Sequence, residues 1–333
     1  PAFNIDALDL ENCIAWQDDI PLKADERTLK HILGLGNEGD RDFQRWVGPV
    51  DAEGNTRGRV QGDGKRTFYF QLSFKQPISI GSVLSEASGL RYLKPKASYP
   101  AKPTDSSAWE TVPAWPNQSG LHASVFPTGT KTRSVCLAVP MQWHRSPQRL
   151  ETWIFYSQRL LNLSPSGHAN ASEEYVPPPP HLGPRPPKRS ARVLTTGRGP
   201  AWENTGKDRE GLIRRPAIDK TSPVWVMLSW RKAHSISGLL PVGECGGFEL
   251  SYYDGPPSIP PKVGTRREWK SLDFEPAHGG VMAFEKTVQT RGIRLNITKA
   301  GRDGAIAKLY GLLALSDLGD SPLPEFVTEE KEV

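Results

Sequence analysis

Apolar and polar residues alternate along several short segments of the chain. Residues 290–298 read TRGIRLNIT and residues 247–253 read GFELSYY, while residues 224–230, VWVMLSW, are rich in β-branched and aromatic side chains. Successive side chains on a strand point to opposite faces, so these segments predict strands. We expect Ile293, Leu295 and Ile297 to face a core. Helical periodicity is confined to a turn or two near residues 24–32.

Segments of the first half of the chain recur in the second half, in the same order. The matches are LSF at 72–74 with LSW at 228–230, Trp109 with Trp269, Thr132-Arg133 with Thr290-Arg291, and LLNLS at 160–164 with LLALS at 312–316. Their offsets are 156 (228 − 72), 160 (269 − 109), 158 (290 − 132) and 152 (312 − 160). Four collinear matches at nearly constant spacing predict an internal duplication, in which each copy is a whole domain.

The composition favours strands joined by many turns. The 333 residues include 31 glycines and 31 prolines, a joint share typical of short strands with frequent turns. Ten tryptophans suit β-sandwich cores, and those inside predicted strands, Trp109, Trp225, Trp230 and Trp269, are expected in the core. No window approaches the ~20 apolar residues of a membrane helix. The residues PAFNIDALDL also lack the pattern of a signal peptide.

A proline-rich segment marks the predicted boundary between the two copies. Residues 175–190 read YVPPPPHLGPRPPKRS, which favours an extended, semi-rigid spacer. The sequence therefore predicts an N-terminal extension at 1–27, a first β-sandwich at 28–164 and a linker at 165–190. A second sandwich follows at 191–319, and a tail at 320–333.

The order of motifs in the second copy resembles the discoidin (coagulation-factor type C) family, within the galactose-binding-like group. The motifs are VWVMLSW, FELSYYDG, EWKSL, TRGIRLNIT and LYGLLAL. The resemblance covers about 192–318, and more weakly 28–164, where GLRYLKPKASYPAKP replaces the aspartate-glycine turn. It implies an all-β fold of two tandem antiparallel, jelly-roll sandwiches that bind ligands at their loop ends.

Candidate ligand-binding residues follow from that resemblance. Exposed aromatic rings stack on sugar faces, and charged or planar polar groups hold the hydroxyls. The candidates are Trp46, Trp143, His144, Arg145, Trp202, Tyr253 and Asp254. For Trp46, Trp143 and Trp202, the alternative is that the indole caps the core.

The resemblance also implies structural calcium in an early loop of each copy. Segments 37–42 (NEGDRD) and 203–210 (ENTGKDRE) supply the oxygen ligands that calcium takes. The candidate ligands are Asn37, Asp40, Asp42, Glu203, Asn204 and Asp208. A polar turn is the alternative, because neither segment fits an EF-hand and both contain basic residues.

Other chemistry finds little support in the sequence. No nucleophile elbow, phosphate loop, HExxH motif or dinucleotide fingerprint is present, and the seven histidines lack metal-ligand spacing. Cys13 and Cys136 could form a disulfide or stay as buried thiols. The net charge of +5 arises from 42 basic and 37 acidic residues that are interspersed, so no nucleic-acid partner is expected.

These features favour a non-catalytic protein that recognises a glycan or glycoprotein outside the cytoplasm, at the cell surface or in the periplasm. Two alternatives remain: a structural subunit whose sandwiches contact protein neighbours in a larger assembly, and an accessory region of an extracellular enzyme.

Overall fold

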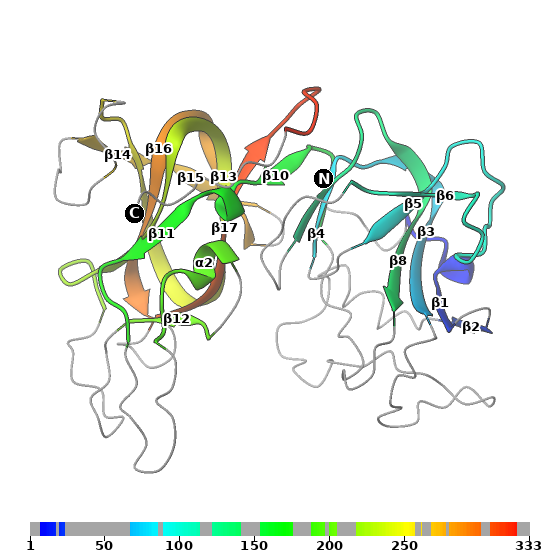
Figure 1. Cartoon of the computed structure of the whole chain (residues 1–333), viewed down its shortest axis with the longest axis horizontal. Helices are drawn as coiled ribbons and strands as arrows, with labels where there is room; N and C mark the ends of the chain where they lie inside the picture. The colour runs from blue at the N-terminus through cyan, green and yellow to red at the C-terminus, as the bar shows by residue number, and fades with distance from the viewer. Residues whose placement is uncertain are drawn as a thin grey trace, which may run out of the picture. The chain divides into compact units, whose positions relative to one another are not determined.

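The computed structural model describes residues 7–17, 20–23, 67–85, 89–113, 122–140, 154–175, 188–196, 200–204, 218–256, 261, 268–277, 280–300 and 307–324. The chain divides into two compact units. Unit 1 comprises residues 1–115, 122–160 and 319–322, and unit 2 comprises residues 116–121, 161–318 and 323–333. The described sheets of both units are antiparallel, so the described part of the chain is all-β apart from short helical turns (Figure 1).

Unit 1 is a sandwich of two sheets. The strands are β1 (Ile14–Gln17), β2 (Ile20–Lys23), β3 (Thr67–Ser79), β4 (Ser82–Ser85), β5 (Leu90–Leu93), β6 (Trp109–Thr111), β7 (His122–Val125), β8 (Lys131–Pro140) and β9 (Ile154–Tyr156), preceded by the 3-10 turn η2 (Leu10–Asn12). One sheet has the order β2-β1-β3-β8-β5-β6 and the other β7-β4-β9. Phe70 and Leu72 of β3 pack with Val83 of β4 and Phe155 of β9 in a single apolar core between the sheets.

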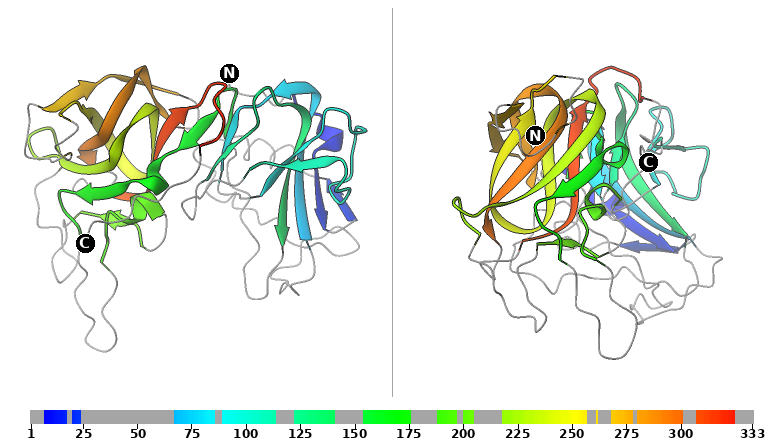
Figure 2. Two further views of the ribbon diagram at one scale, coloured as in Figure 1. Left: turned by 45° about the horizontal axis from the view of Figure 1, so that its top comes forward. Right: turned by 60° about the vertical axis from the view of Figure 1, so that its left-hand side comes forward.

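Unit 2 contains one continuous sheet built around two long, strongly bent strands (Figures 1 and 2). Its elements are β10 (Leu160–Asn162), whose first residue belongs to unit 1, η4 (Ser164–Ser166), β11 (His168–Ala171), α2 (Val193–Thr196), β12 (Trp202–Glu203), β13 (Val224–Tyr253), β14 (Trp269–Leu272), β15 (Phe274–Pro276), β16 (Met282–Ala300) and β17 (Lys308–Asp317). Both ends of β13 pair with the same part of β16, because Val224 and Phe248 each lie opposite Ile297. Different parts of β13 therefore occupy separate positions in the sheet, as several shorter strands would.

The strand pairings of unit 1 recur in unit 2 at nearly constant spacing. Leu72 pairs with Val135, and Leu228 pairs with Ile293, so the offsets are 156 (228 − 72) and 158 (293 − 135). The same correspondence holds for five more pairings: Ala15–Phe70 with Ala171–Val226, Leu90–Leu137 with Leu250–Leu295, Leu93–Trp109 with Tyr253–Trp269, Val83–Ser124 with Leu239–Met282, and Val83–Phe155 with Leu239–Ala314.

Two sequence-predicted boundaries need correction. The N-terminal extension expected at 1–27 contains β1, which pairs with β3 inside the sheet of unit 1. The linker expected at 165–190 contains β11, which pairs with β13 of unit 2. A four-residue strand gives too short a pattern to recognise from sequence, and its place is fixed by its longer partner.

The proline-rich segment does not separate the two units. Tyr175 and Arg189 form an isolated β-bridge, and Lys188 forms an ion pair with Glu174. The Glu174 carboxylate also accepts hydrogen bonds from Ser190 Oγ (3.1 Å) and Ala191 N (2.8 Å). The two ends of this segment therefore meet within unit 2, while residues 176–187 lie outside the described part.

Most of the predicted core positions are confirmed where the structure describes them, but Trp225 is only partly buried. Ile293, Leu295 and Ile297 are fully buried. Trp109, Trp230 and Trp269 are nearly fully buried. The three cysteines are free thiols, and Cys13 and Cys136 are buried. Burial raises the pKa of the Cys13 thiol to about 11 and that of Cys136 to about 12, so both are protonated at neutral pH.

Candidate functional site

The loop from Lys94 to Ala108, which joins β5 to β6 in unit 1, is closed at its base by backbone hydrogen bonds. Lys94 N donates to Ala108 O (2.9 Å), and Ala97 N donates back to Lys94 O (3.0 Å) to form a turn. The indole Nε1 of Trp109, the first residue of β6, donates to Lys102 O (2.9 Å). The middle of the loop is thus attached to a buried strand residue.

A second attachment fixes the loop through Tyr99. Its hydroxyl donates to Asp9 Oδ2 (2.5 Å), and the guanidinium of Arg133 lies 3.5 Å from the centre of its ring. Arg133 also donates to the carbonyl oxygens of Phe74 (3.4 Å) and Lys75 (3.1 Å) in the middle of β3. We call Asp9, Tyr99 and Arg133 the clasp. It joins the N-terminal segment, the loop and two strands of the sheet.

The clasp shifts the pKa values of its acidic members in opposite directions. Burial opposes the charged form of Asp9, but hydrogen bonds from Tyr99 and Asn12 and the charge of Arg133 outweigh it, so the pKa of Asp9 lies below its ordinary value. Burial, together with the neighbouring Asp9 carboxylate, raises the pKa of Tyr99 to about 12. At neutral pH the clasp therefore holds a carboxylate, a protonated phenol and a guanidinium.

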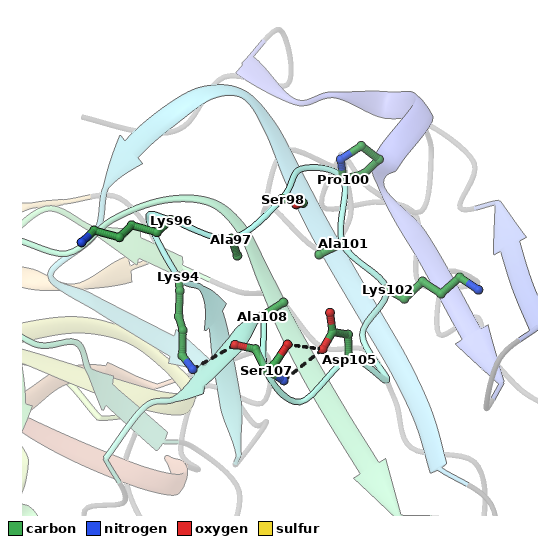
Figure 3. Close-up of a pocket in the computed structure, with 10 residues that line it drawn as sticks. All are labelled: Lys94, Lys96, Ala97, Ser98, Pro100, Ala101, Lys102, Asp105, Ser107 and Ala108. Carbon is green, nitrogen blue, oxygen red and sulfur yellow. Dashed lines mark hydrogen bonds between the residues drawn. The ribbon is translucent and has the colours of Figure 1, made fainter.

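The loop lines an open pocket of about 510 Å³. Figure 3 shows its lining, which comes entirely from the loop: Lys94, Lys96, Ala97, Ser98, Pro100, Ala101, Lys102, Asp105, Ser107 and Ala108. Three alanines and a proline supply apolar surface, while two serines, one carboxylate and three ammonium groups supply polar contacts. This volume falls within the range of about 300–1,000 Å³ that is typical of small-molecule sites.

Hydrogen bonds orient the polar side of the pocket. Asp105 Oδ1 accepts from Ser107 N (3.0 Å) and from Ser107 Oγ (2.6 Å). These bonds lower the pKa of Asp105, so its carboxylate is charged at neutral pH. Lys94 Nζ donates to Ser107 O (3.0 Å), which leaves its other protons available to a ligand.

The structure corrects the role expected for Trp202 and Tyr253. Trp202 is fully buried, and its Nε1 donates to Glu173 O (2.9 Å). Tyr253 is 2% exposed and packs edge-on against Trp269, with ring centres 5.7 Å apart. Neither ring offers a face to solvent for stacking, so both belong to the core of unit 2.

Asp254 is exposed and forms an ion pair with Lys270 on β14. The other ligand-binding candidates, Trp46, Trp143, His144 and Arg145, lie outside the described residues. None of the three described candidates, Trp202, Tyr253 and Asp254, lines the pocket.

Two of the three calcium ligands expected in unit 2 lie in the interior. Glu203 and Asn204 are buried, and Asn204 Oδ1 accepts a hydrogen bond from Ala307 N (2.9 Å). No group of three or more His, Cys, Asp or Glu side chains that could hold a metal is found among the residues that the structure describes. Asn37, Asp40, Asp42 and Asp208 lie outside this part of the chain.

Sequence reasoning missed the pocket residues, although one signal pointed to them. The segment GLRYLKPKASYPAKP is where the first copy departs from the motif order of the second. A departure confined to one loop between matching strands marks the place where the two copies differ. The alternating strands do not indicate a binding site, because their pattern reflects only how their side chains pack in the core.

Among the described helices, none is long and apolar enough to cross a membrane. No family model matches the chain. No curated protein matches it either.

Several solved structures resemble the chain at low identity. A fucolectin from striped bass (Morone saxatilis) serum is 10% identical, with a TM-score of 0.26, over 95% of this chain and 99% of that one. A family 32 carbohydrate-binding module of NanJ from C. perfringens, solved with galactose, is 13% identical, with a TM-score of 0.30, over 47% of this chain and 99% of that one. Allantoicase from Saccharomyces cerevisiae is 11% identical, with a TM-score of 0.29, over 81% of this chain and 83% of that one. These values do not assign the chain to a family.

Proposed function

We propose that this chain is a non-catalytic carbohydrate-binding protein made of two tandem galactose-binding-like sandwiches, and that the pocket of the 94–108 loop in unit 1 holds a sugar. The observation that carries the proposal is the preformed pocket, whose loop is attached to the fold through Trp109 and through the clasp. A loop fixed before binding loses little conformational freedom when a ligand arrives.

The chemistry of the lining fits a sugar. The methyl groups of Ala97 and Ala101, which are partly buried, provide an apolar surface for the C–H face of a pyranose ring. The exposed carboxylate of Asp105 accepts hydrogen bonds from hydroxyl groups, and lysine ammonium groups donate to ring or hydroxyl oxygens.

The same lining supports a binding role over hydrolysis. Glycoside hydrolysis needs two carboxyl groups at a defined separation. Asp105 is the single carboxylate among the described residues that line the pocket. We therefore place the protein among binding proteins, and propose that it meets its glycan in the extracellular or periplasmic space.

The recurrent strand pairings support the tandem arrangement. Copies that arose by duplication keep the register of their strands, because a shift of one residue would turn every core side chain to the wrong face. In this account each copy starts close to the turn that precedes β1 or β11, so the proline-rich segment is a loop inside the second copy.

Affinity electrophoresis of the full chain tests the proposed function. Native gels would contain, one at a time, galactan, chitosan, dextran, polygalacturonate or dextran sulfate. We expect retardation by at least one polysaccharide and suppression of the shift by its free oligosaccharide. A folded chain that migrates alike in every gel would show that the protein does not bind these carbohydrates.

A further inference from the structure

We propose that the ligand of the 94–108 pocket is an acidic polysaccharide, whose repeating carboxylate or sulfate groups contact Lys96 and Lys102 on either side of the pocket. This inference rests on the proposed function and specifies the class of sugar.

The charge of the pocket favours a negatively charged ligand. Its lining contains three lysines and one aspartate, which gives a formal charge of +2 (3 − 1). The aspartate is engaged within the loop, since Asp105 Oδ1 already accepts two hydrogen bonds from Ser107. Its carboxylate therefore neutralises one charge of the lining and leaves an excess of ammonium groups.

Two of these ammonium groups have no acidic partner. No hydrogen bond or ion pair of the Lys96 or Lys102 side chain is found within the described ranges, and both residues are exposed. Lys188 and Lys270, by contrast, form ion pairs with Glu174 and Asp254. Unpaired ammonium groups beside a concave surface attract anions and raise their local concentration.

The directions of the side chains favour a polymer over a single sugar. In Figure 3, Lys96 and Lys102 extend away from the pocket on opposite sides, while Lys94 turns toward Ser107. A monosaccharide seated between the alanines would contact neither outer lysine in this arrangement. A chain with a negative group on successive residues would meet both while one ring occupies the pocket.

The test compares acidic and neutral polysaccharides on the full chain. Dissociation constants would be measured by affinity electrophoresis in polygalacturonate, dextran sulfate and neutral galactan, at 50 and 500 mM NaCl. The variant is Lys96→Gln/Lys102→Gln. The matched control is Lys286→Gln/Lys299→Gln, which removes the same charge from two exposed positions in unit 2. Circular dichroism melting would verify that both variants fold.

We expect the wild type to bind an acidic polysaccharide, and the pocket variant to bind it roughly fivefold more weakly, as two exposed ion contacts supply. The control should bind like the wild type, and 500 mM salt should weaken binding of the wild type more than that of the pocket variant. Retardation by polygalacturonate alone would identify carboxylates as the ligand groups. Retardation by dextran sulfate alone would identify sulfates.

Three results would overturn the inference. Equal retardation by galactan and the acidic polymers, unchanged in the pocket variant, would leave the proposed function intact and refute the acidic ligand. Equal losses of affinity in the pocket variant and the control would show that binding depends on the net charge of the protein and not on the two pocket lysines. Binding to single-stranded DNA as tight as to the acidic polysaccharides, with the same loss in the pocket variant, would identify a polyanion site that is not specific for carbohydrate.

Discussion

Thr132 and Thr290 make the same hydrogen bonds in the two units. Thr132 Oγ1 lies 2.9 Å from Leu93 O and accepts a bond from Ser134 N at 3.2 Å. Thr290 Oγ1 lies 2.7 Å from Tyr253 O and accepts a bond from Gly292 N at 3.1 Å. In each unit the buried hydroxyl joins the strand that carries it to the neighbouring strand, at the point where a loop begins.

Replacing either threonine by valine should therefore destabilise the chain by a similar amount. Valine keeps the shape of the side chain but leaves a buried carbonyl and a buried N–H without this partner, which costs about 1–3 kcal/mol. Urea denaturation followed by tryptophan fluorescence would measure the loss. Thr132→Ser and Thr290→Ser, which keep the hydroxyl, should recover most of it. A Thr132→Val variant as stable as the wild type would argue against the shared structural role.

The clasp should make stability depend on pH at both extremes. Asp9 has a pKa below its ordinary 3.8 in the folded chain, so its contribution is present above about pH 4 and is lost as the pH falls through the folded pKa. Tyr99 has a folded pKa of about 12, above its ordinary 10, so its contribution is present below pH 10 and is lost as the pH rises toward 12.

Melting temperatures between pH 2 and pH 11.5 would show both limbs. Tyr99→Phe should flatten the alkaline limb and reduce the acid limb, because it removes a hydrogen bond to Asp9. If the pH profiles of Tyr99→Phe and the wild type coincide after a constant offset, the clasp does not account for the pH dependence.

Much of the strand pattern could be predicted from the sequence, because the alternation of apolar and polar residues reflects which face of a strand is buried. The TRGIRLNIT segment placed Ile293, Leu295 and Ile297 in the core, and all three are buried there. In GFELSYY the alternation expected of a strand fails at its end, where Ser251 and Tyr253 are buried and Tyr252 between them is partly exposed. Trp269 covers the outer face of that strand, so burial no longer follows a period of two.

The errors at the boundaries and at the site have a common physical cause. Prolines restrict the backbone locally, but they do not reveal whether the two ends of a segment diverge or meet, as Tyr175 and Arg189 do. The sequence around a tryptophan does not show whether the side chain is exposed or buried by elements that are distant along the chain. Trp202 stands beside charged residues and is buried in this way. Lys96 and Ala101 line one pocket, and Tyr99 between them is held by Asp9, 90 residues earlier in the sequence.

The corrected role of Trp202 predicts a loss of stability without a loss of binding. Trp202→Phe removes the hydrogen bond to Glu173 O and leaves a small cavity, so the free energy of unfolding should fall by about 1–3 kcal/mol. Retardation by a polysaccharide that binds the wild type should not change at a temperature where the variant is folded. A folded Trp202→Phe variant that has lost binding would restore the tryptophan as a ligand contact.

The central claim is that a carbohydrate occupies the pocket of the 94–108 loop, and filling that pocket tests it most directly. Ala101→Leu adds bulk at the pocket wall, while Ala233→Leu makes the same change at an exposed position of β13 in unit 2. The measurement is the dissociation constant for the polysaccharide that retards the wild type. We predict that Ala101→Leu weakens binding at least about tenfold through steric overlap with the ligand, and that Ala233→Leu leaves it unchanged. A folded Ala101→Leu variant that binds as tightly as the wild type would contradict the account.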